Sequence, residues 1–271
     1  MKGLPTVRFL YFLTITFLFA TSCGTLSNGR GWGEDAIYPV QLERIPKAAY
    51  HALVDWQTWV PAAGAILFRI NNYDQKVSDW ATEHKPLFGS SRGAETASDY
   101  IRAGLYTEVL ATVLATPSGD SAEEWTYSKM KGLTVEGMAL GLTSAATTWV
   151  KHSTDRTRPD GSDTNSFPSG HASGAFGAAT LSNRNLDCIP MSYETRIPLQ
   201  AGNMVLATAD AWARIEAKKH FPSDVLAGAA LGHFLTAFIH DAFLGLPERK
   251  GFAVSITPAR GGAIGLLTFS Y

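Results

Sequence analysis

Phe167-Pro168-Ser169-Gly170-His171 is the stretch around which the rest of this chain is organised. Directly after it, residues 172–182 are rich in Ala and Gly, which predicts a closely packed helix that begins near Ser169. The free backbone N–H groups at such a helix N-terminus favour an anion, and Gly170 permits close approach of a ligand. His171 would then lie in the first helical turn, beside that anion. Taken alone, the stretch is more simply explained as a helix cap with an exposed histidine.

A basic segment lies just upstream of this stretch. It has the pattern Lys151-x6-Arg158, and Pro159 follows at once. Because Pro159 prevents a helix from continuing smoothly, we expect Arg158 where helix gives way to loop, a position from which a long side chain can reach into a cleft. Taken alone, this segment is the usual solvated end of a helix.

A second histidine lies downstream, in the pattern Arg214-x5-His220-x3-Asp224. Pro222 predicts a break that places His220 at the end of one helix and Asp224 at the start of the next. A carboxylate near an imidazole can fix its tautomer and stabilise its charged form. Arg214 precedes His220 by nearly two helical turns and can share its face. Taken alone, this segment is equally a structural His–Asp pair across a helix corner.

A zinc site is the alternative use of these residues, since two histidines and Asp224 are acceptable zinc ligands. The nearby cations Lys151, Arg158 and Arg214 count against it, because they repel a divalent cation and attract an oxyanion. His171 and His220 also lack the close spacing typical of metal ligands. We therefore expect no metal and no other cofactor.

Taken in this order, the three segments resemble the motifs of the type 2 phosphatidic acid phosphatase and vanadium haloperoxidase superfamily. The resemblance covers Lys151 to Asp224 and implies a helical-bundle fold. One departure is clear, because that superfamily usually has Ser where Ala213 precedes Arg214. The loss puts in doubt a supporting hydrogen bond more than the activity.

The resemblance also implies a role for each motif residue in a metal-independent phosphatase. His220 would attack phosphorus and form a phosphohistidine, Asp224 would orient His220, and His171 would protonate the leaving oxygen and later activate water. The phosphoryl oxygens would be held by three cations and by the helix N-terminus, namely by Lys151, Arg158, Arg214, Ser169 and the N–H of Gly170. These motifs would recognise only the phosphoryl group, so they do not distinguish a phosphomonoester substrate from a pyrophosphate.

Hydrophobic periodicity outside the motifs predicts an all-α domain with a small C-terminal β-hairpin. The expected helices are 48–71 with a break or kink at Pro61, 74–83, 96–115, 122–151 behind a capping box of Ser121 and Glu124, 172–182, 198–219 and 223–244. Residues 183–196 are expected to be irregular, and 252–256 and 264–271 to be strands. No segment is expected to cross a membrane, since 132–150 carries Glu136 and the apolar run 225–239 is too short.

The N-terminus has the pattern of a secretory signal, with Lys2 and Arg8 before an uncharged apolar run, 9–20, and small residues before Cys23. Cys23 resembles the lipidated cysteine of bacterial lipoproteins, and Gly24 after it favours the outer membrane. The alternative is an ordinary cleaved signal with an incidental cysteine. The expected domains are a signal peptide (1–22), a lipidated N-terminus and tether (23–45), a helical phosphatase domain (46–245) and a β tail (246–271).

Composition limits the remaining functions. The formal net charge is −1, so no overall basic field favours nucleic acid. The anchor predicts a periplasm-facing protein of the cell envelope. The resemblance implies an enzyme that acts on a phosphate-containing substrate, and a lipid phosphate is preferred to a soluble ester because the anchor would keep the site near a membrane. A vanadium-dependent haloperoxidase and a non-catalytic lipoprotein with a degenerate site are the two other readings. Halide oxidation with vanadate and peroxide, or inactivity against a panel of phosphate esters, would distinguish them.

Overall fold

The computed structural model describes residues 24–36, 42–244, 252–259 and 262–269. The predicted signal peptide and Cys23 lie outside these residues. The described chain is mostly helical, which confirms the predicted bundle class. Around two central helices, α7 (Gly170–Cys188) and α9 (Pro222–Phe243), lie α2 (Arg44–Val54), α3 (Trp56–Phe68), η1 (Ile70–Asn72), α4 (Tyr73–His84), α5 (Ser91–Ala115), α6 (Ala122–Thr154) and α8 (Tyr193–Glu216).

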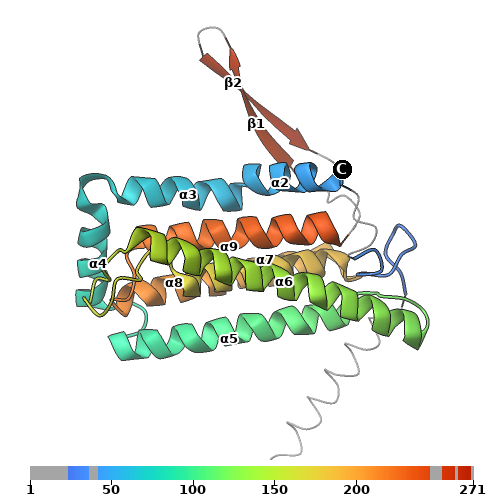
Figure 1. Cartoon of the computed structure of the whole chain (residues 1–271), viewed down its shortest axis with the longest axis horizontal. Helices are drawn as coiled ribbons and strands as arrows, with labels where there is room; N and C mark the ends of the chain where they lie inside the picture. Colours follow the sequence, from blue (N-terminus) through green and yellow to red (C-terminus); the bar gives the residue numbers. More distant parts are fainter. Residues whose placement is uncertain (1–23, 37–41, 245–251, 260–261, 270–271) are drawn as a thin grey trace, which may run out of the picture.

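The two central helices pack on each other, and between them they contact all the long outer helices (Figure 1). Their close approach depends on glycines in α9. A Cβ at Gly232 would lie 2.2 Å from the Ser173 carbonyl oxygen, and one at Gly228 would lie 2.5 Å from that of Ser169. Because a real Cβ cannot come so near a carbonyl oxygen, these glycines set the distance between α9 and the first turns of α7.

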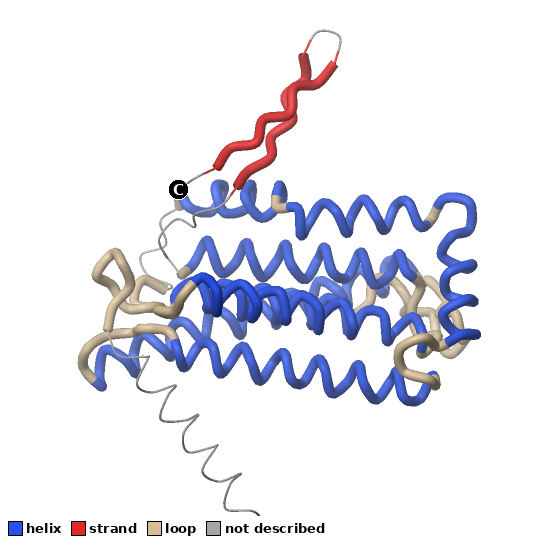
Figure 2. Tube along the Cα trace, turned by 180° about the vertical axis from the view of Figure 1, so that it is seen from behind, coloured by secondary structure: helices blue, strands red, loops and turns tan. Residues whose placement is uncertain are grey.

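Loops gather at the two ends of the bundle, as the view from behind shows (Figure 2). The short helix α4 crosses one end nearly at right angles to the long helices (Figure 1). The loop between α6 and α7 and the corner between α8 and α9 lie at this same end. The three predicted motifs therefore converge at the end of the bundle that α4 covers.

Several helix boundaries differ from the sequence expectation. The prediction that 183–196 is irregular was wrong, because α7 continues to Cys188 and α8 begins at Tyr193. The polar side chains that indicated a loop are instead buried and paired: Arg184 forms an ion pair with Asp241 at 2.7 Å, and Asn185 donates to Thr112 at 3.2 Å. Buried polar pairing inside a helix is invisible to a hydrophobicity pattern.

The start of α6 was predicted correctly. Its capping box is present, with Glu124 N–H donating to Ser121 Oγ at 3.2 Å and the Glu124 carboxylate accepting from Ser121 N–H at 3.3 Å. The predicted break at Pro61 was wrong, since α3 runs through Pro61 and the break falls at Asp55. Asp55 caps α3 by accepting from Gln57 N–H at 3.0 Å.

Residues 24–36, expected to be part of a flexible tether, pack on the bundle at the end opposite α4. Trp32 is fully buried, and its backbone N–H donates to the Pro117 carbonyl at 2.7 Å. Its ring lies directly on Gly132 of α6, where a Cβ would come within 2.1 Å of it. A large buried aromatic side chain accounts for the order of this Gly-rich segment.

The C-terminal strands are β1 (Phe252–Ala259) and β2 (Gly262–Phe269), which pair antiparallel with Phe252 opposite Phe269. Residues 260–261 between them lie outside the described part of the chain. The predicted hairpin as a whole, and the predicted domain boundaries, therefore stay predictions.

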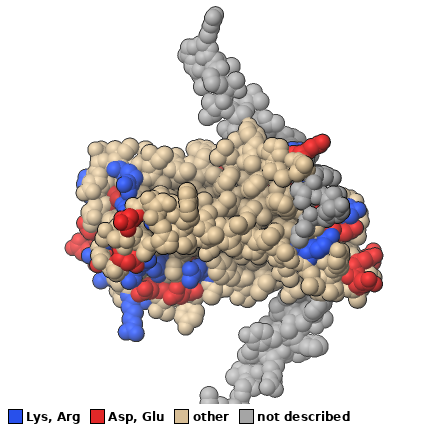
Figure 3. Space-filling view, viewed as in Figure 1, with Lys and Arg blue, Asp and Glu red and all other residues tan. Residues whose placement is uncertain are grey.

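Charged side chains gather toward the two ends of the bundle, and the middle of the face in Figure 3 shows almost none. Large apolar side chains are exposed on α5 and α6, among them Tyr106, Leu110 and Leu114 on α5 and Met138, Leu142 and Trp149 on α6. By length and composition, α9 is also able to cross a membrane, although 61% of its most apolar window is buried in the bundle. The argument that the apolar run 225–239 is too short was wrong, because the helix extends beyond that run. The expectation that no segment crosses a membrane stays a prediction.

Candidate active site

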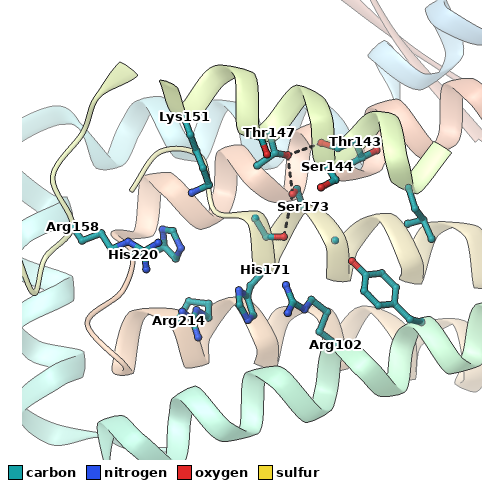
Figure 4. A pocket seen from close by; sticks show the side chains of 15 residues that line it. Arg102, Thr143, Ser144, Thr147, Lys151, Arg158, His171, Ser173, Arg214 and His220 are labelled. Carbon is teal, nitrogen blue, oxygen red and sulfur yellow. Dashed lines mark hydrogen bonds between the residues drawn. The ribbon is translucent and has the colours of Figure 1, made fainter. Parts of the chain in front are cut away.

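A cavity of about 240 Å³ opens at the α4 end of the bundle. Its walls come from α5, α6, the α6–α7 loop, α7, α8 and the corner before α9. Six of the eight predicted site residues line it, namely Lys151, Arg158, Gly170, His171, Arg214 and His220. Figure 4 shows the cationic and imidazole side chains pointing into one space. The other two predicted residues, Ser169 and Asp224, lie behind the wall.

The α7 N-terminus is held by backbone and cap contacts, as its sequence predicts. Ser169 N–H donates to the Asp224 carbonyl at 2.9 Å, and Ser169 Oγ accepts from Ala172 N–H at 3.4 Å. Ser169 is fully buried and does not line the cavity, so contact with substrate by its hydroxyl stays a prediction. A Cβ at Gly170 would make only ordinary contacts with Lys151 and Thr147, at 3.9 Å. Protein packing therefore does not require glycine at position 170.

His220 is 2% exposed and borders the cavity. Its Nδ1 lies 2.7 Å from the carbonyl oxygen of Ser166. Because a carbonyl only accepts, Nδ1 must carry the proton, which leaves the lone pair on Nε2. Burial, with the charges of Lys151 and Arg214, lowers the pKa of His220 to about 4 despite the opposing effect of Asp224. The ring is therefore neutral at neutral pH, the form that a nucleophile requires.

Asp224 supports His220 less directly than the sequence motif implies. Its Oδ2 lies 3.8 Å from His220 Nδ1, beyond hydrogen-bond distance, and instead accepts from Ser166 Oγ at 2.6 Å. Ser166 thus lies between the two, with its hydroxyl on Asp224 and its carbonyl on His220. Burial acts to raise the pKa of Asp224, but the interactions with His220, Arg156 and Ser166 outweigh it and hold this pKa below its usual value.

Arg156 was not among the predicted site residues, yet it joins Asp224 to a distant helix. Its guanidinium forms ion pairs with Asp224 and, at 2.9 Å, with Asp74 of α4. Asp74 in turn accepts from Ser223, at 2.8 Å from the backbone N–H and 2.5 Å from the hydroxyl. The sequence around Asp74 carries no motif that could have indicated this role.

His171 also has a partner that the sequence did not reveal. Its Nε2 lies 2.9 Å from a carboxylate oxygen of Asp99 on α5. Since a carboxylate accepts, Nε2 holds a proton in the resting site. Burial, with the charges of Arg214 and Arg102, lowers the pKa of His171 to about 4, and Asp99 acts in the opposite direction.

Three cations surround the space between the two histidines, as predicted. Arg214 is 4% exposed and donates to Ser98 Oγ at 3.0 Å, while its Nε has no partner. Lys151 donates to the Asn165 carbonyl at 2.5 Å, and burial together with the charge of Arg158 lowers its pKa to about 8. These charges favour an anion in the cavity.

The departure at Ala213 has a packing explanation. Its methyl group is fully buried in an apolar cluster with Ala94, Ala217 and Phe88. The alanine methyl group thus contributes to this apolar packing. Elsewhere in the described ranges, no group of three or more His, Cys, Asp or Glu side chains is placed to hold a metal ion. The expected absence of a metal stays a prediction.

Part of this chain matches a known family. Residues 133–246 match the family described as the PAP2 superfamily. A curated relative, the lipid A 1-phosphatase of Porphyromonas gingivalis (strain ATCC 33277), is 38% identical over 109 residues, which cover 39% of this chain but only 22% of the relative. This chain therefore matches about a fifth of that relative's length.

One solved structure is also similar, that of the first transmembrane PAP2 type phosphatidylglycerolphosphate phosphatase from Bacillus subtilis. It shares 18% identity, covers 73% of this chain and 94% of its own, and has a TM-score of 0.46. All eight predicted site residues, from Lys151 to Asp224, fall within residues 133–246, the part of the chain that matches the PAP2 superfamily.

Proposed function

We propose that this protein is a phosphatase that cleaves a phosphomonoester or a pyrophosphate, with a lipid phosphate as substrate, through a phosphohistidine intermediate. The observation that carries the proposal is the state of His220. Its proton is fixed on Nδ1 by the Ser166 carbonyl, so the lone pair is on Nε2, and the ring borders a cavity that is lined by several cations, among them Lys151, Arg158 and Arg214. A neutral imidazole beside a cationic anion site is the arrangement that nucleophilic attack on a phosphoryl group requires.

In the first step, Lys151, Arg158 and Arg214 hold the phosphoryl oxygens and offset their charge. The Nε2 lone pair of His220 forms a bond to phosphorus while the bond from phosphorus to the leaving oxygen breaks. Protonated His171 gives its proton to that oxygen. The negative charge of the bound phosphate offsets the cations that lower the pKa of His171, and so favours its protonated form.

In the second step, neutral His171 accepts a proton from water as the water oxygen attacks phosphorus. The P–N bond breaks, His220 regains its lone pair and inorganic phosphate leaves. The phosphorylated imidazole carries a positive charge, because Nδ1 keeps its proton while Nε2 is bonded to phosphorus. Asp224 stabilises this charge with its carboxylate and through Ser166. In this scheme the fixed cations take the electrostatic role that a metal ion fills in other phosphatases.

A lipid substrate is supported by the surroundings of the cavity. The volume of about 240 Å³ lies below the range of about 300–1,000 Å³ usual for sites that enclose a drug-sized ligand. It accommodates a phosphate and the first atoms of a leaving group, so acyl chains must lie outside. Exposed apolar side chains on α5 and α6, among them Tyr106, Leu142 and Trp149, provide apolar surface for them. The names of both relatives also specify phosphatases of lipids.

The proposed location of the enzyme in the cell rests on the predicted lipidation of Cys23. Lipidation of Cys23 would hold the enzyme at a membrane on the periplasmic side, with the outer membrane favoured. Mass spectrometry of the mature N-terminus tests the lipid, and fractionation of the envelope tests the compartment.

The mechanism is tested by trapping the intermediate. Rapid acid-free quenching with a ³²P-labelled substrate should yield a protein-bound phosphate that is stable to base and labile to acid, as expected for a phosphohistidine. In His220→Ala the label should disappear and turnover should fall by at least about 10³-fold, as for loss of a catalytic nucleophile. Circular dichroism should show that the variant remains helical. Turnover retained in a folded His220→Ala variant would exclude the mechanism.

A further inference from the structure

The cavity extends beyond the group of cations that would hold the phosphate. Past His171, its walls are formed by Arg102 and Tyr106 of α5 and by Leu140, Thr143 and Ser144 of α6, with Gly174 of α7 beneath them. Figure 4 shows Arg102 on the opposite side of His171 from His220. We call this part of the cavity the distal lobe. Nothing in the proposed mechanism so far uses its residues.

The geometry of phosphoryl transfer specifies what the distal lobe receives. The attacking nitrogen and the leaving oxygen lie roughly in line on opposite sides of phosphorus. With His220 as the nucleophile, the leaving group must therefore extend away from His220 and past His171. That direction leads into the distal lobe, so its chemistry selects the leaving group.

Arg102 gives this lobe a positive charge that protein groups offset only in part. Among the described residues its ion-pair partner is Asp99, at a long 3.8 Å, and Asp99 is engaged more closely by His171 at 2.9 Å. Asp210 of α8 also interacts with Arg102, but Asp210 is fully buried and both of its carboxylate oxygens lack hydrogen-bond partners. Burial raises the pKa of Asp210 to about 7, so near neutral pH it is charged only part of the time.

The rest of the lobe offers hydrogen-bond donors rather than further charge. The hydroxyl of Tyr106 lies against Gly174, where a Cβ would come within 2.3 Å of it. Burial raises the pKa of Tyr106, which keeps this hydroxyl a neutral donor. Ser144 contributes a hydroxyl from the facing helix, whereas the hydroxyl of Thr143 donates to the Ala139 carbonyl at 2.8 Å. One cation with two hydroxyls is suited to a second phosphate, whereas a neutral alkyl alcohol cannot offset the charge of that cation.

We propose that the distal lobe is a leaving-group subsite in which Arg102 binds a second phosphate, so that the enzyme prefers a diphosphate ester to the monophosphate of the same alcohol. The inference rests on the proposed phosphatase function and specifies its substrate. In the reaction, Nε2 of His220 bonds to the terminal phosphorus and the bond to the bridging oxygen breaks. The departing monophosphate carries the electron pair of that bond, and Arg102 offsets its charge. A phosphate leaves more readily than an alkoxide, so it depends less on a proton from His171.

The test compares dodecyl diphosphate with dodecyl monophosphate on the full chain in detergent. The variants are Arg102→Met, Arg102→Lys and, as a matched control, Arg92→Met, which removes an exposed arginine from the same helix outside the cavity. Wild-type enzyme should have the higher kcat/KM for the diphosphate. Arg102→Met should lower that value by about 10- to 100-fold, the effect of one charge-assisted hydrogen bond, and change the monophosphate value by less than about 3-fold. Arg102→Lys should restore part of the loss, and Arg92→Met should change neither value.

A binding measurement distinguishes the loss of a phosphate-binding subsite in Arg102→Met from an indirect effect of that substitution on His171. Methylenediphosphonate, which is not hydrolysed, should bind Arg102→Met about 10-fold more weakly, while the inhibition constant of vanadate should not change. An equal loss on both dodecyl substrates, or an unchanged preference, would overturn the subsite. If wild-type enzyme releases phosphate from neither substrate, the proposed phosphatase function itself fails, which is a different outcome.

Discussion

At the scale of single residues, the site depends on which nitrogen of each histidine carries a proton. The Ser166 carbonyl fixes the proton of His220 on Nδ1, and the Asp99 carboxylate holds the proton of His171 on Nε2. In their neutral forms, His220 therefore has its lone pair on Nε2 and His171 has its lone pair on Nδ1. The two partners differ in kind, since a carbonyl is always neutral and a carboxylate adds a charge that favours the protonated ring.

The pH dependence of turnover follows from these partners. The first step requires protonated His171 and neutral His220, and the pKa of each in the free enzyme is lowered to about 4, so kcat/KM should peak at acid pH and fall on either side, with the fall at higher pH set by His171. Asp99→Asn removes a charge that raises the pKa of His171, so that fall should begin at lower pH. At neutral pH the loss should be about 10-fold, measured with a monophosphate substrate whose leaving group needs the proton.

The control for Asp99 is the same substitution in a His171→Ala background. If Asp99 acts through His171, Asp99→Asn should have no further effect there, because the two changes remove one interaction. Additive losses, or an unshifted pH profile in the single variant, would mean that Asp99 has another role.

Sequence reasoning found the motif residues but not their partners, for a physical reason. The resemblance carried by the three motifs together predicted that Lys151, Arg158, His171, Arg214 and His220 form one site, and all five line one cavity. Asp74 and Asp99 are single acidic residues on helices without motifs. Only the packing of α4 and α5 against the site gives them a function.

At the scale of helices, the close approach of α7 and α9 positions both halves of the site. Gly228 and Gly232 bring α9 against the backbone of Ser169 and Ser173, so the corner that carries His220 lies beside the turn that carries His171. Helix extents were harder to predict than helix existence. The polar residues 183–196 indicated a loop, yet paired and buried side chains such as Arg184 let α7 continue.

Gly232→Ala tests the helix contact. Its Cβ would lie 2.2 Å from the Ser173 carbonyl oxygen, and because backbone cannot move aside easily, we expect a loss of about 1–3 kcal/mol in the free energy of unfolding. Gly137→Ala on α6 is the matched control, since a Cβ there has no atom within 4 Å, and it should be neutral or slightly stabilising. Denaturant unfolding in the same detergent measures both. Equal stability of the two variants would contradict the close-contact explanation.

At the scale of the whole molecule, α4 joins the two sides of the site across the end of the bundle. Asp74 pairs with Arg156 and Ser223, and Arg156 pairs with Asp224, so four residues from three segments form one buried polar chain. None of the four lines the cavity. Their effect on turnover must therefore pass through the position of Asp224 and Ser166.

Asp74→Asn tests this connection. It leaves Arg156 with one fewer carboxylate in a largely buried position, so we expect a loss of about 3–5 kcal/mol in the free energy of unfolding and a lower kcat with little change in KM. Asp79→Asn, on the exposed side of the same helix, should change neither quantity. A folded Asp74→Asn variant with wild-type kcat would show that α4 supports the fold alone.

The link through Asp74 also bears on which part of the chain is an autonomous unit. The family match begins at residue 133, but Asp74, Ser98, Asp99 and Arg102 all precede it and contact site residues or line the site. A fragment that begins at the family boundary would retain the motif residues and lose every one of these contacts. The cooperative unit therefore begins no later than α4, and transplanting only the matched segment between relatives would transfer the reactive groups without their supports.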